Sequence, residues 1–248
     1  MTSVATTEHH ARALSPIQLE ELLLRADRAQ VMGSLSRGMA HDLRGPLQTL
    51  TLLVDPHADF LTPGEGNRLR TAMSDSVQHL ADTITRFSQI YAAQELEPMP
   101  IIVEELLNYV ADLQRYQRGL PLVEVEVRLP GGLAPVRGVE AQLRHALLSL
   151  VINAKEALAD HPAPVITLAA EPGDGSMRLL VEDNGPGMSE ELRHRAFEPF
   201  HTTRDGHLGI GLPVAARLAE KNGGRLSLEA RAGGGTRALL RLPCWKRP

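Results

Sequence analysis

The sequence predicts two parts of different fold class, an all-helical part followed by an α/β part. Apolar residues spaced by three and four positions run through residues 35–54 and again through 69–91, which is typical of helices with one buried face. Segments that alternate apolar and charged residues appear only after the prolines at 98 and 100. A chain of 248 residues has room for one or two domains. We therefore expect a disordered tail at 1–14, a helical domain at 15–96 and an α/β domain at 97–248.

Composition excludes several classes of protein. The single cysteine, Cys244, excludes an intrachain disulfide and paired-cysteine zinc sites. A net charge of −4 and an aromatic content of 3% argue against a basic or base-stacking nucleic-acid surface. No apolar run reaches the roughly 18 residues that a membrane span needs, and the first 13 residues lack the apolar region of a signal peptide. We expect a cytoplasmic protein that neither binds nucleic acid nor spans a membrane.

The helical part predicts a dimer. Ser15 and Pro16 form a helix start, with serine as N-cap and proline at the first helical position. Two antiparallel helices cannot bury both apolar seams by themselves, whereas two such hairpins can do so as a four-helix bundle. We infer a homodimer through residues 16–94, hinged at a proline-containing linker, Gln94–Pro100.

The second part mixes helices and strands. The final helix ends at Asn222, Gly223 and Gly224, which favour a helix C-terminus. A polar row on the middle helix has the spacing of a solvated face and comprises Gln142, His145, Ser149, Asn153 and Glu156. The expected helices are 104–118, 139–160 and 208–221, and the expected strands are 122–129, 165–170, 177–182, 225–230 and 236–242.

His41 is the first candidate for chemistry. Its position relative to Met39 and Leu43 points it away from the apolar seam, where a lone histidine is ordinarily just a surface residue. However, Asp42 supplies a carboxylate that could orient the imidazole, and a neutral imidazole is a good nucleophile. Pro46 also removes the helical hydrogen bond to the carbonyl of Asp42, which destabilises the helix at this point. Such a cost is unexpected beside a histidine that has no function.

Residues 41–47, His-Asp-Leu-Arg-Gly-Pro-Leu, resemble the H-box of sensor histidine kinases. The resemblance implies that His41 is the phosphoacceptor and that Asp42 assists proton transfer. Gly45 stands where that family often has Thr or Asn to position water for dephosphorylating its partner. The resemblance therefore implies weak phosphatase activity.

Three glycine-containing segments resemble the nucleotide boxes of the histidine kinase, gyrase and chaperone ATPase superfamily, although each alone reads as a turn. Residues 183–188 resemble the G1 box, in which the aspartate, here Asp183, hydrogen-bonds the adenine amino group. Residues 206–212 resemble the G2 box, with His207 at a usual glycine, and open a helix whose amides can approach phosphate. Residues 233–236 resemble the last glycine box and also suit a hairpin turn.

Residues 147–157 resemble the N-box of the same superfamily, which implies that Asn153 ligates Mg²⁺ between the phosphates. Its amide oxygen suits that hard cation. Ser149 departs from the usual kinase asparagine. Gyrase-type and chaperone ATPases carry a glutamate there as the base for water, a role that serine cannot fill, which argues against a dedicated ATPase.

Residues 197–204 resemble the F-box and lid of the nitrogen-regulation type of histidine kinase, which implies that Phe197 and Phe200 anchor a lid and that Arg204 reaches the γ-phosphate. Plain core packing is the simpler explanation of the two aromatics. Taken together, the resemblance implies catalytic roles for His41, Asp42 and Arg204, a metal ligand in Asn153, and cofactor contacts from Asn153, Lys155, Asp183, Gly185, Gly187, Thr203, Gly209, Ile210, Gly211, Leu212 and Thr236.

These boxes occur in family order over residues 16–243. The resemblance implies a dimeric four-helix bundle followed by a Bergerat-type α/β sandwich. It implies an ATP-dependent protein histidine kinase (EC 2.7.13.3 type) that uses Mg²⁺, phosphorylates His41 and passes the phosphoryl group to an aspartate of a response-regulator receiver domain. Since the kinase core takes up nearly all residues, we expect an upstream sensor protein as a further partner. The alternatives are a non-catalytic phosphotransfer scaffold and, ranked lower because it needs no H-box, a GHKL-type ATPase or Ser/Thr anti-sigma kinase.

Overall fold

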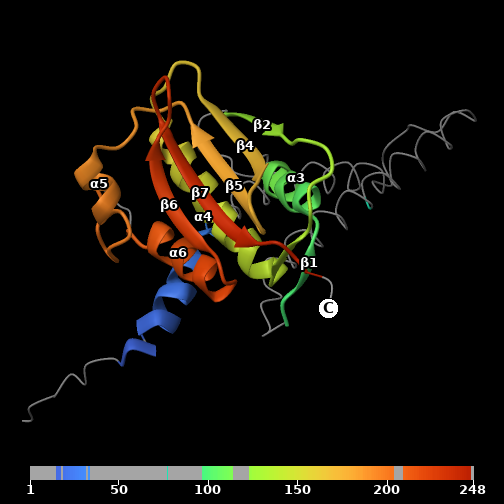
Figure 1. Ribbon diagram of the computed structural model, residues 1–248. Coiled ribbons are helices and arrows are strands. Elements are labelled where there is room, and N and C mark those ends of the chain that lie inside the picture. Colours follow the sequence, from blue (N-terminus) through green and yellow to red (C-terminus); the bar gives the residue numbers. More distant parts are fainter. Residues whose placement is uncertain are drawn as a thin grey trace, which may run out of the picture.

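The computed structural model describes residues 15–17, 19–31, 33, 77, 97–113, 123–203 and 209–246. Within them, a mixed sheet carries helices on one face (Figure 1). The strands are β1 (Met99–Ile101), β2 (Glu124–Arg128), β3 (Val136–Gly138), β4 (Val165–Pro172), β5 (Ser176–Asp183), β6 (Arg225–Ala230) and β7 (Thr236–Pro243). The helices are α3 (Val103–Leu113), α4 (Glu140–Ala157), α5 (Glu190–Arg195) and α6 (Gly211–Lys221).

The main sheet has five strands in the order β2-β4-β5-β7-β6. Only β2 and β4 pair in parallel, and the other neighbours are antiparallel. The central strand β5 lies between β4 and β7 and is buried over most of its length. The register that pairs Asp183 with Ile166 places this carboxylate at the end of β5. Asp183 therefore lies where β5 ends, at one edge of the helical layer.

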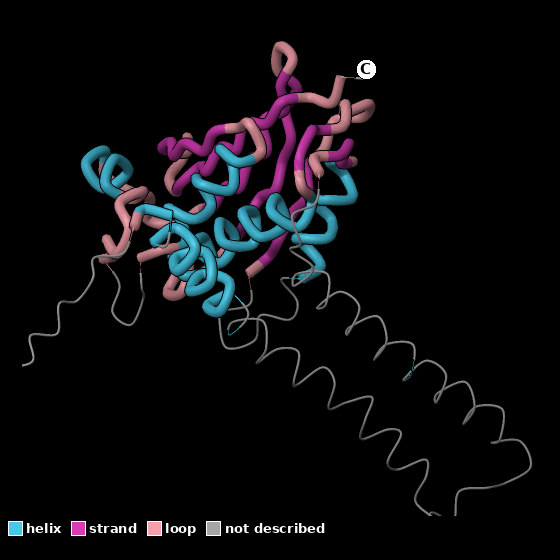
Figure 2. The backbone as a smooth tube through the Cα atoms, turned by 90° about the horizontal axis from the view of Figure 1, so that it is seen from below, coloured by secondary structure: helices cyan, strands magenta, loops and turns pink. Residues whose placement is uncertain are grey.

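Helix α4 is the centre of the core. Its apolar residues are spread around most of the helix, and Leu143, Leu147 and Leu148 are fully buried, as expected for a helix packed between a sheet and other helices. Figure 2 shows the sheet as one layer and the helices as a second. Helix α4 contacts β5, α3 and α6, so the residues on its remaining face are available to a site.

Asn222 ties the C-terminal end of α6 to the start of α4. Its side chain accepts a hydrogen bond from the Val139 N–H at 2.7 Å and donates to Leu218 O at 2.7 Å and to Gln142 Oε1 at 3.0 Å. Gly223 follows with φ +70°, and the Gly224 N–H donates to Ala219 O, which closes the helix as the sequence predicted. These bonds hold the two helices that flank the candidate site in a fixed relation.

The expected strands and helices of this part are present, with boundaries that differ by a few residues. The linker prediction was wrong at its end, because Met99 and Pro100 belong to β1, which pairs antiparallel with β3. Proline is tolerated in such a short outer strand. The sequence prediction also missed β3 and the six-residue helix α5, which buries no residue. Of the predicted helical domain, the structure describes residues 15–17, 19–31, 33 and 77, so the predictions of a bundle, of its dimer and of both apolar seams lie outside the described residues.

The chain is helical at residues 16–17, 19–31 and 33, as Ser15 and Pro16 predicted. We call residues 19–31 the N-terminal helix. In Figure 1 it lies beside α6, and its Val31 is 2% exposed within the core. Among the described residues, no helix is both long and apolar enough to cross a membrane.

Candidate functional site

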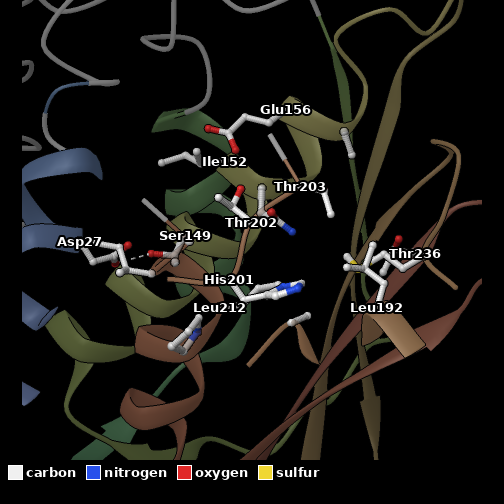
Figure 3. Close-up of a pocket in the computed structure, with 18 of the residues that line it drawn as sticks. Asp27, Ser149, Ile152, Glu156, Leu192, His201, Thr202, Thr203, Leu212 and Thr236 are labelled. Atoms are coloured by element: carbon white, nitrogen blue, oxygen red, sulfur yellow. Dashed lines mark hydrogen bonds between the residues drawn. The ribbon is translucent and has the colours of Figure 1, made fainter. Parts of the chain in front are cut away.

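A cavity of about 300 Å³ opens between α4, the loop after β5, the first turn of α6 and the N-terminal helix (Figure 3). This volume lies at the lower end of the range for small-molecule pockets. Its walls combine polar groups with apolar side chains such as Ile152 and Leu212. Eight of the residues predicted to contact a cofactor line it, namely Asn153, Gly187, Thr203, Gly209, Ile210, Gly211, Leu212 and Thr236.

Asp183 lies beside this cavity in a fixed orientation. Its Oδ1 accepts hydrogen bonds from the Gly185 N–H at 2.9 Å and from the Thr236 N–H at 3.2 Å, and the residue is 5% exposed. The neighbouring Asn184 amide holds the start of β4, accepting from the Val165 N–H and donating to Ala163 O, both at 2.8 Å. The loop after β5 is thus clamped to two strands, which fixes where the carboxylate points.

The two glycine loops touch backbone to backbone. Gly187 has φ +74° and Gly235 has φ +99°. A Cβ on Gly187 would lie 3.0 Å from Gly235 O, and one on Gly235 would lie 1.9 Å from Asp183 O. Only glycine fits at such a crossing. The loop after β5 and the loop before β7 are therefore packed together, and they reach the cavity through Gly187 and Thr236.

The segment before α6 also closes on itself. The Phe200 N–H donates to Gly209 O at 3.0 Å, and a Cβ on Gly209 (φ +65°) would lie 2.6 Å from His201 O. Phe197 packs partly buried against the core, as expected for an anchor. Phe200 does not: it is 60% exposed, and its backbone adopts φ +64°, a strained conformation for a side-chain-bearing residue. The prediction that both aromatics pack was wrong for Phe200.

Two residues of the polar row on α4 are buried, contrary to the usual explanation of such a row as a solvated face, whereas Gln142, Asn153 and Glu156 stay partly exposed. His145 is 5% exposed and Ser149 is 4% exposed, because the N-terminal helix covers them. The Ser149 Oγ–H donates to Asp27 Oδ2 at 2.9 Å (Figure 3), and His145 Nε2 lies 2.8 Å from the same oxygen, without hydrogen-bond alignment. Asp27 itself is 1% exposed.

The structure brings together the predicted residues of the N-box, both glycine loops and the start of α6. Three predicted contacts, Asp183, Gly185 and Lys155, do not line the cavity: the Gly185 N–H donates to Asp183 beside it, and Lys155 is buried in α4. His41, Asp42 and Arg204 lie outside the described residues. Sequence reasoning missed the wall from the N-terminal helix, formed by Asp27, Gln30 and Val31. No local signal could have found it, since 122 positions separate Asp27 from Ser149.

A magnesium ion is implied by the N-box resemblance. Mg²⁺ is ordinarily held by one or two protein oxygens together with phosphate and water. Asn153 and Glu156 both line the cavity and offer an amide and a carboxylate oxygen. No cluster of three or more His, Cys, Asp or Glu that could hold a metal occurs in the described part of the chain. These donors fit a cation that arrives with a nucleotide.

Lys155 is a buried lysine on α4, 3% exposed. Burial lowers its pKa from 10.5 to about 8, because the ammonium loses hydration. The unfolded chain therefore holds this proton between about pH 8 and 10.5 while the folded chain has lost it. The free energy of unfolding consequently rises as the pH increases from about 8 to 10.5. Below about pH 8 the lysine is charged in both states, so the full cost of burying its charge lowers the stability.

We predict that Lys155→Met makes the free energy of unfolding less dependent on pH. The difference in unfolding free energy between variant and wild type should shift by about 2 kcal/mol in favour of wild type from pH 8 to 10. Urea unfolding at several pH values measures it. Lys246→Met, a lysine outside the core, serves as the control. Parallel pH profiles for Lys155→Met and wild type would contradict the lowered pKa.

Residues 138–246 match the family described as histidine kinase-, DNA gyrase B-, and HSP90-like ATPase. Sensor histidine kinase ZraS of Klebsiella oxytoca is 27% identical over 229 residues, covering 91% of this chain and 49% of that protein. The chain spans less than half the length of the curated relatives it matches.

Two solved structures share the fold. The ATP-binding domain of PrrB from Mycobacterium tuberculosis superposes with a TM-score of 0.51 at 28% identity, covering 61% of this chain and all of that one. Histidine kinase ThkA in complex with response regulator protein TrrA superposes with a TM-score of 0.52 at 22% identity, covering 94% and 68%. The resemblance to sensor histidine kinases is confirmed: residues 138–246 match the family of histidine kinase-, gyrase B- and HSP90-like ATPases, and the curated relatives of the chain include sensor histidine kinases.

Proposed function

We propose that this chain is the kinase core of a two-component system, which binds Mg-ATP, phosphorylates its own His41 and passes the phosphoryl group to an aspartate of a response regulator. The observation that carries the proposal is the cavity itself. It joins Asn153 of α4, Gly187 of the loop after β5, Gly211 of α6 and Thr236 of β7, which are the N-box and the glycine boxes in one place.

Each wall has a distinct task in this proposal. The clamped Asp183 carboxylate accepts a hydrogen bond from the adenine amino group. The N–H groups in the first turn of α6, which no intrahelical carbonyl occupies, point their partial positive charge toward the phosphates. Asn153 offers its amide oxygen to Mg²⁺, which would neutralise charge that develops between the phosphates.

In the transfer step, an imidazole nitrogen of His41 attacks the γ-phosphorus. The bond from that phosphorus to the bridging oxygen breaks, and ADP leaves with the electron pair. Asp42 takes up the imidazole proton. The phosphohistidine then gives its phosphoryl group to a carboxylate oxygen of the regulator. The response-regulator complex of the ThkA relative supports this partnership, and we extend the proposal to a homodimer through residues 16–94.

The experiment is labelling from ATP carrying a radioactive γ-phosphate, with Mg²⁺. We expect wild type to acquire an acid-labile, base-stable label, and His41→Gln to lose it because no imidazole is present to attack. His57→Gln changes another histidine of the helical part and should label normally. Both variants should bind ADP like wild type by calorimetry.

Acid-labile label on His41→Gln would refute the His41 assignment. A wild-type chain that binds Mg-ADP but never acquires label would favour the non-catalytic phosphotransfer scaffold instead.

A further inference from the structure

The N-terminal helix runs antiparallel to α6 and is held at both ends. Near its start, Glu20 bridges Arg217 at 2.9 Å and Lys221 at 2.6 Å, in the second half of α6. Near its other end, Asp27 reaches the first turn of α6, where a Cβ on Gly211 would lie 3.7 Å from Asp27 Oδ1. Seven residues of helix span roughly 10 Å, which matches the distance along α6 between these contacts.

The two attachments differ in chemistry. Hydrogen bonds from Arg217 and Lys221 lower the pKa of Glu20 from 4.5 to about 2, so this outer pair stays ionised at neutral pH. The inner attachment is a buried carboxylate, since Asp27 is 1% exposed and lies on Ser149 and His145. Burying a carboxylate costs free energy unless partners compensate it. Asp27 is therefore stable in this buried position only while Ser149 and His145 contact it.

The place of the inner attachment matters most. Asp27 shares the cavity with Asn153, Gly209 and Gly211. It lies between Ser149, one turn before Asn153 on α4, and Gly211, at the start of α6. No acidic residue of α6 itself occupies its first turn. A carboxylate from a distant segment therefore lies where the helix terminus favours an anion.

We propose that the N-terminal helix is an autoinhibitory element of the nucleotide site: when seated, it presents the Asp27 carboxylate to the region that receives the phosphates. This inference rests on the proposed nucleotide site. Like charges in one partly dehydrated cavity repel, so nucleotide binding and seating of the helix oppose each other. By linkage, each weakens the other by the same factor. Release of the helix, which leads in sequence to His41, thus accompanies nucleotide binding.

The first test measures Mg-ADP affinity by calorimetry in the full chain. Asp27→Asn keeps the side-chain shape and an oxygen for Ser149 but removes the charge, so we expect roughly tenfold tighter binding, within the usual range of coupling between sites. Glu21→Gln is the matched control: it removes one carboxylate from the same helix at an exposed position, where Glu21 pairs with Arg25 one turn away. Its affinity should equal that of wild type.

A second variant loosens the helix without touching the cavity. Glu20→Lys reverses the charge opposite Arg217 and Lys221, and it should also tighten Mg-ADP binding. In wild type, hydrogen–deuterium exchange of the amides in residues 19–31 should speed up when Mg-ADP is added, because bound nucleotide displaces the helix. These readouts detect gains, so they do not depend on a variant that merely fails to fold.

Three outcomes would overturn the inference while leaving the nucleotide site intact. The first is an unchanged affinity in Asp27→Asn. The second is a weaker affinity of Asp27→Asn that appears only with Mg²⁺, which would make Asp27 a metal ligand. The third is slower exchange of the amides in residues 19–31 when nucleotide is added. If wild type and all variants failed to bind Mg-ADP, the proposed nucleotide site would fall and the inference with it.

Discussion

Gly235→Ala is expected to destabilise the fold by about 4 kcal/mol or more, at the extreme end of single substitutions. The new Cβ would lie 1.9 Å from the backbone oxygen of Asp183, at a position with φ +99°. Backbone cannot yield as a side chain can, so β5 and β7 would have to separate where they meet the cavity. Urea unfolding followed by circular dichroism measures the loss.

Gly234→Ala separates the steric part of this effect from the conformational part. Gly234 has nearly the same φ, +100°, but a Cβ there would meet nothing within 4 Å. We expect a cost of only about 1–2 kcal/mol for the strained backbone. Equal losses in the two variants would show that the crossing with Asp183 is not close.

Asp183→Asn is expected to remove detectable nucleotide binding while the chain stays folded. Asparagine keeps an oxygen for the N–H groups of Gly185 and Thr236. It replaces the second carboxylate oxygen with an amide that donates, which opposes the adenine amino group, itself a donor. The variant therefore loses a hydrogen bond to a charged group. It also leaves two buried donors, the asparagine amide and the adenine amino group, without an acceptor.

Calorimetry with ADP measures this effect, and we expect at least a hundredfold loss of affinity. Asp174→Asn makes the same chemical change in an exposed turn between β4 and β5, and should bind normally. Thermal unfolding confirms that both variants are folded. Retained affinity in Asp183→Asn would remove Asp183 from the site.

Sequence reasoning succeeded where local pattern and burial agree. The strand β6 was predicted at its observed bounds, and the end of α6 followed from Asn222 and two glycines. It failed for short elements: β1 and β3 have three residues each, and Pro100 argued against a strand. Periodicity cannot reveal a three-residue strand whose pairing lies far along the chain.

The candidate site shows the same division. The glycine loops and the N-box can be recognised from residue types at close spacing in the sequence, so Gly187, Asn153 and Gly211 were predicted correctly as cavity residues. The polar row on α4 was also found, but its usual explanation as a solvated face was wrong for His145 and Ser149, which are buried. His145 and Ser149 are covered by the N-terminal helix, more than a hundred positions away in the sequence, and only tertiary packing decides that contact.

The small strand β3 has a consequence for modularity. It pairs with β1 on one side, while its Val136 bridges Cys244, and the Trp245 N–H donates to Pro135 O at 2.8 Å. Strand β1 and the residues that follow β7 therefore both pair with β3, so the beginning and the end of the α/β part lie beside the same short strand. A domain whose two ends emerge together can be grafted after, or inserted between, other segments with few broken contacts. Joining residue 246 to residue 97 and opening the chain at another surface loop would give a circular permutant of this domain with its sheet intact.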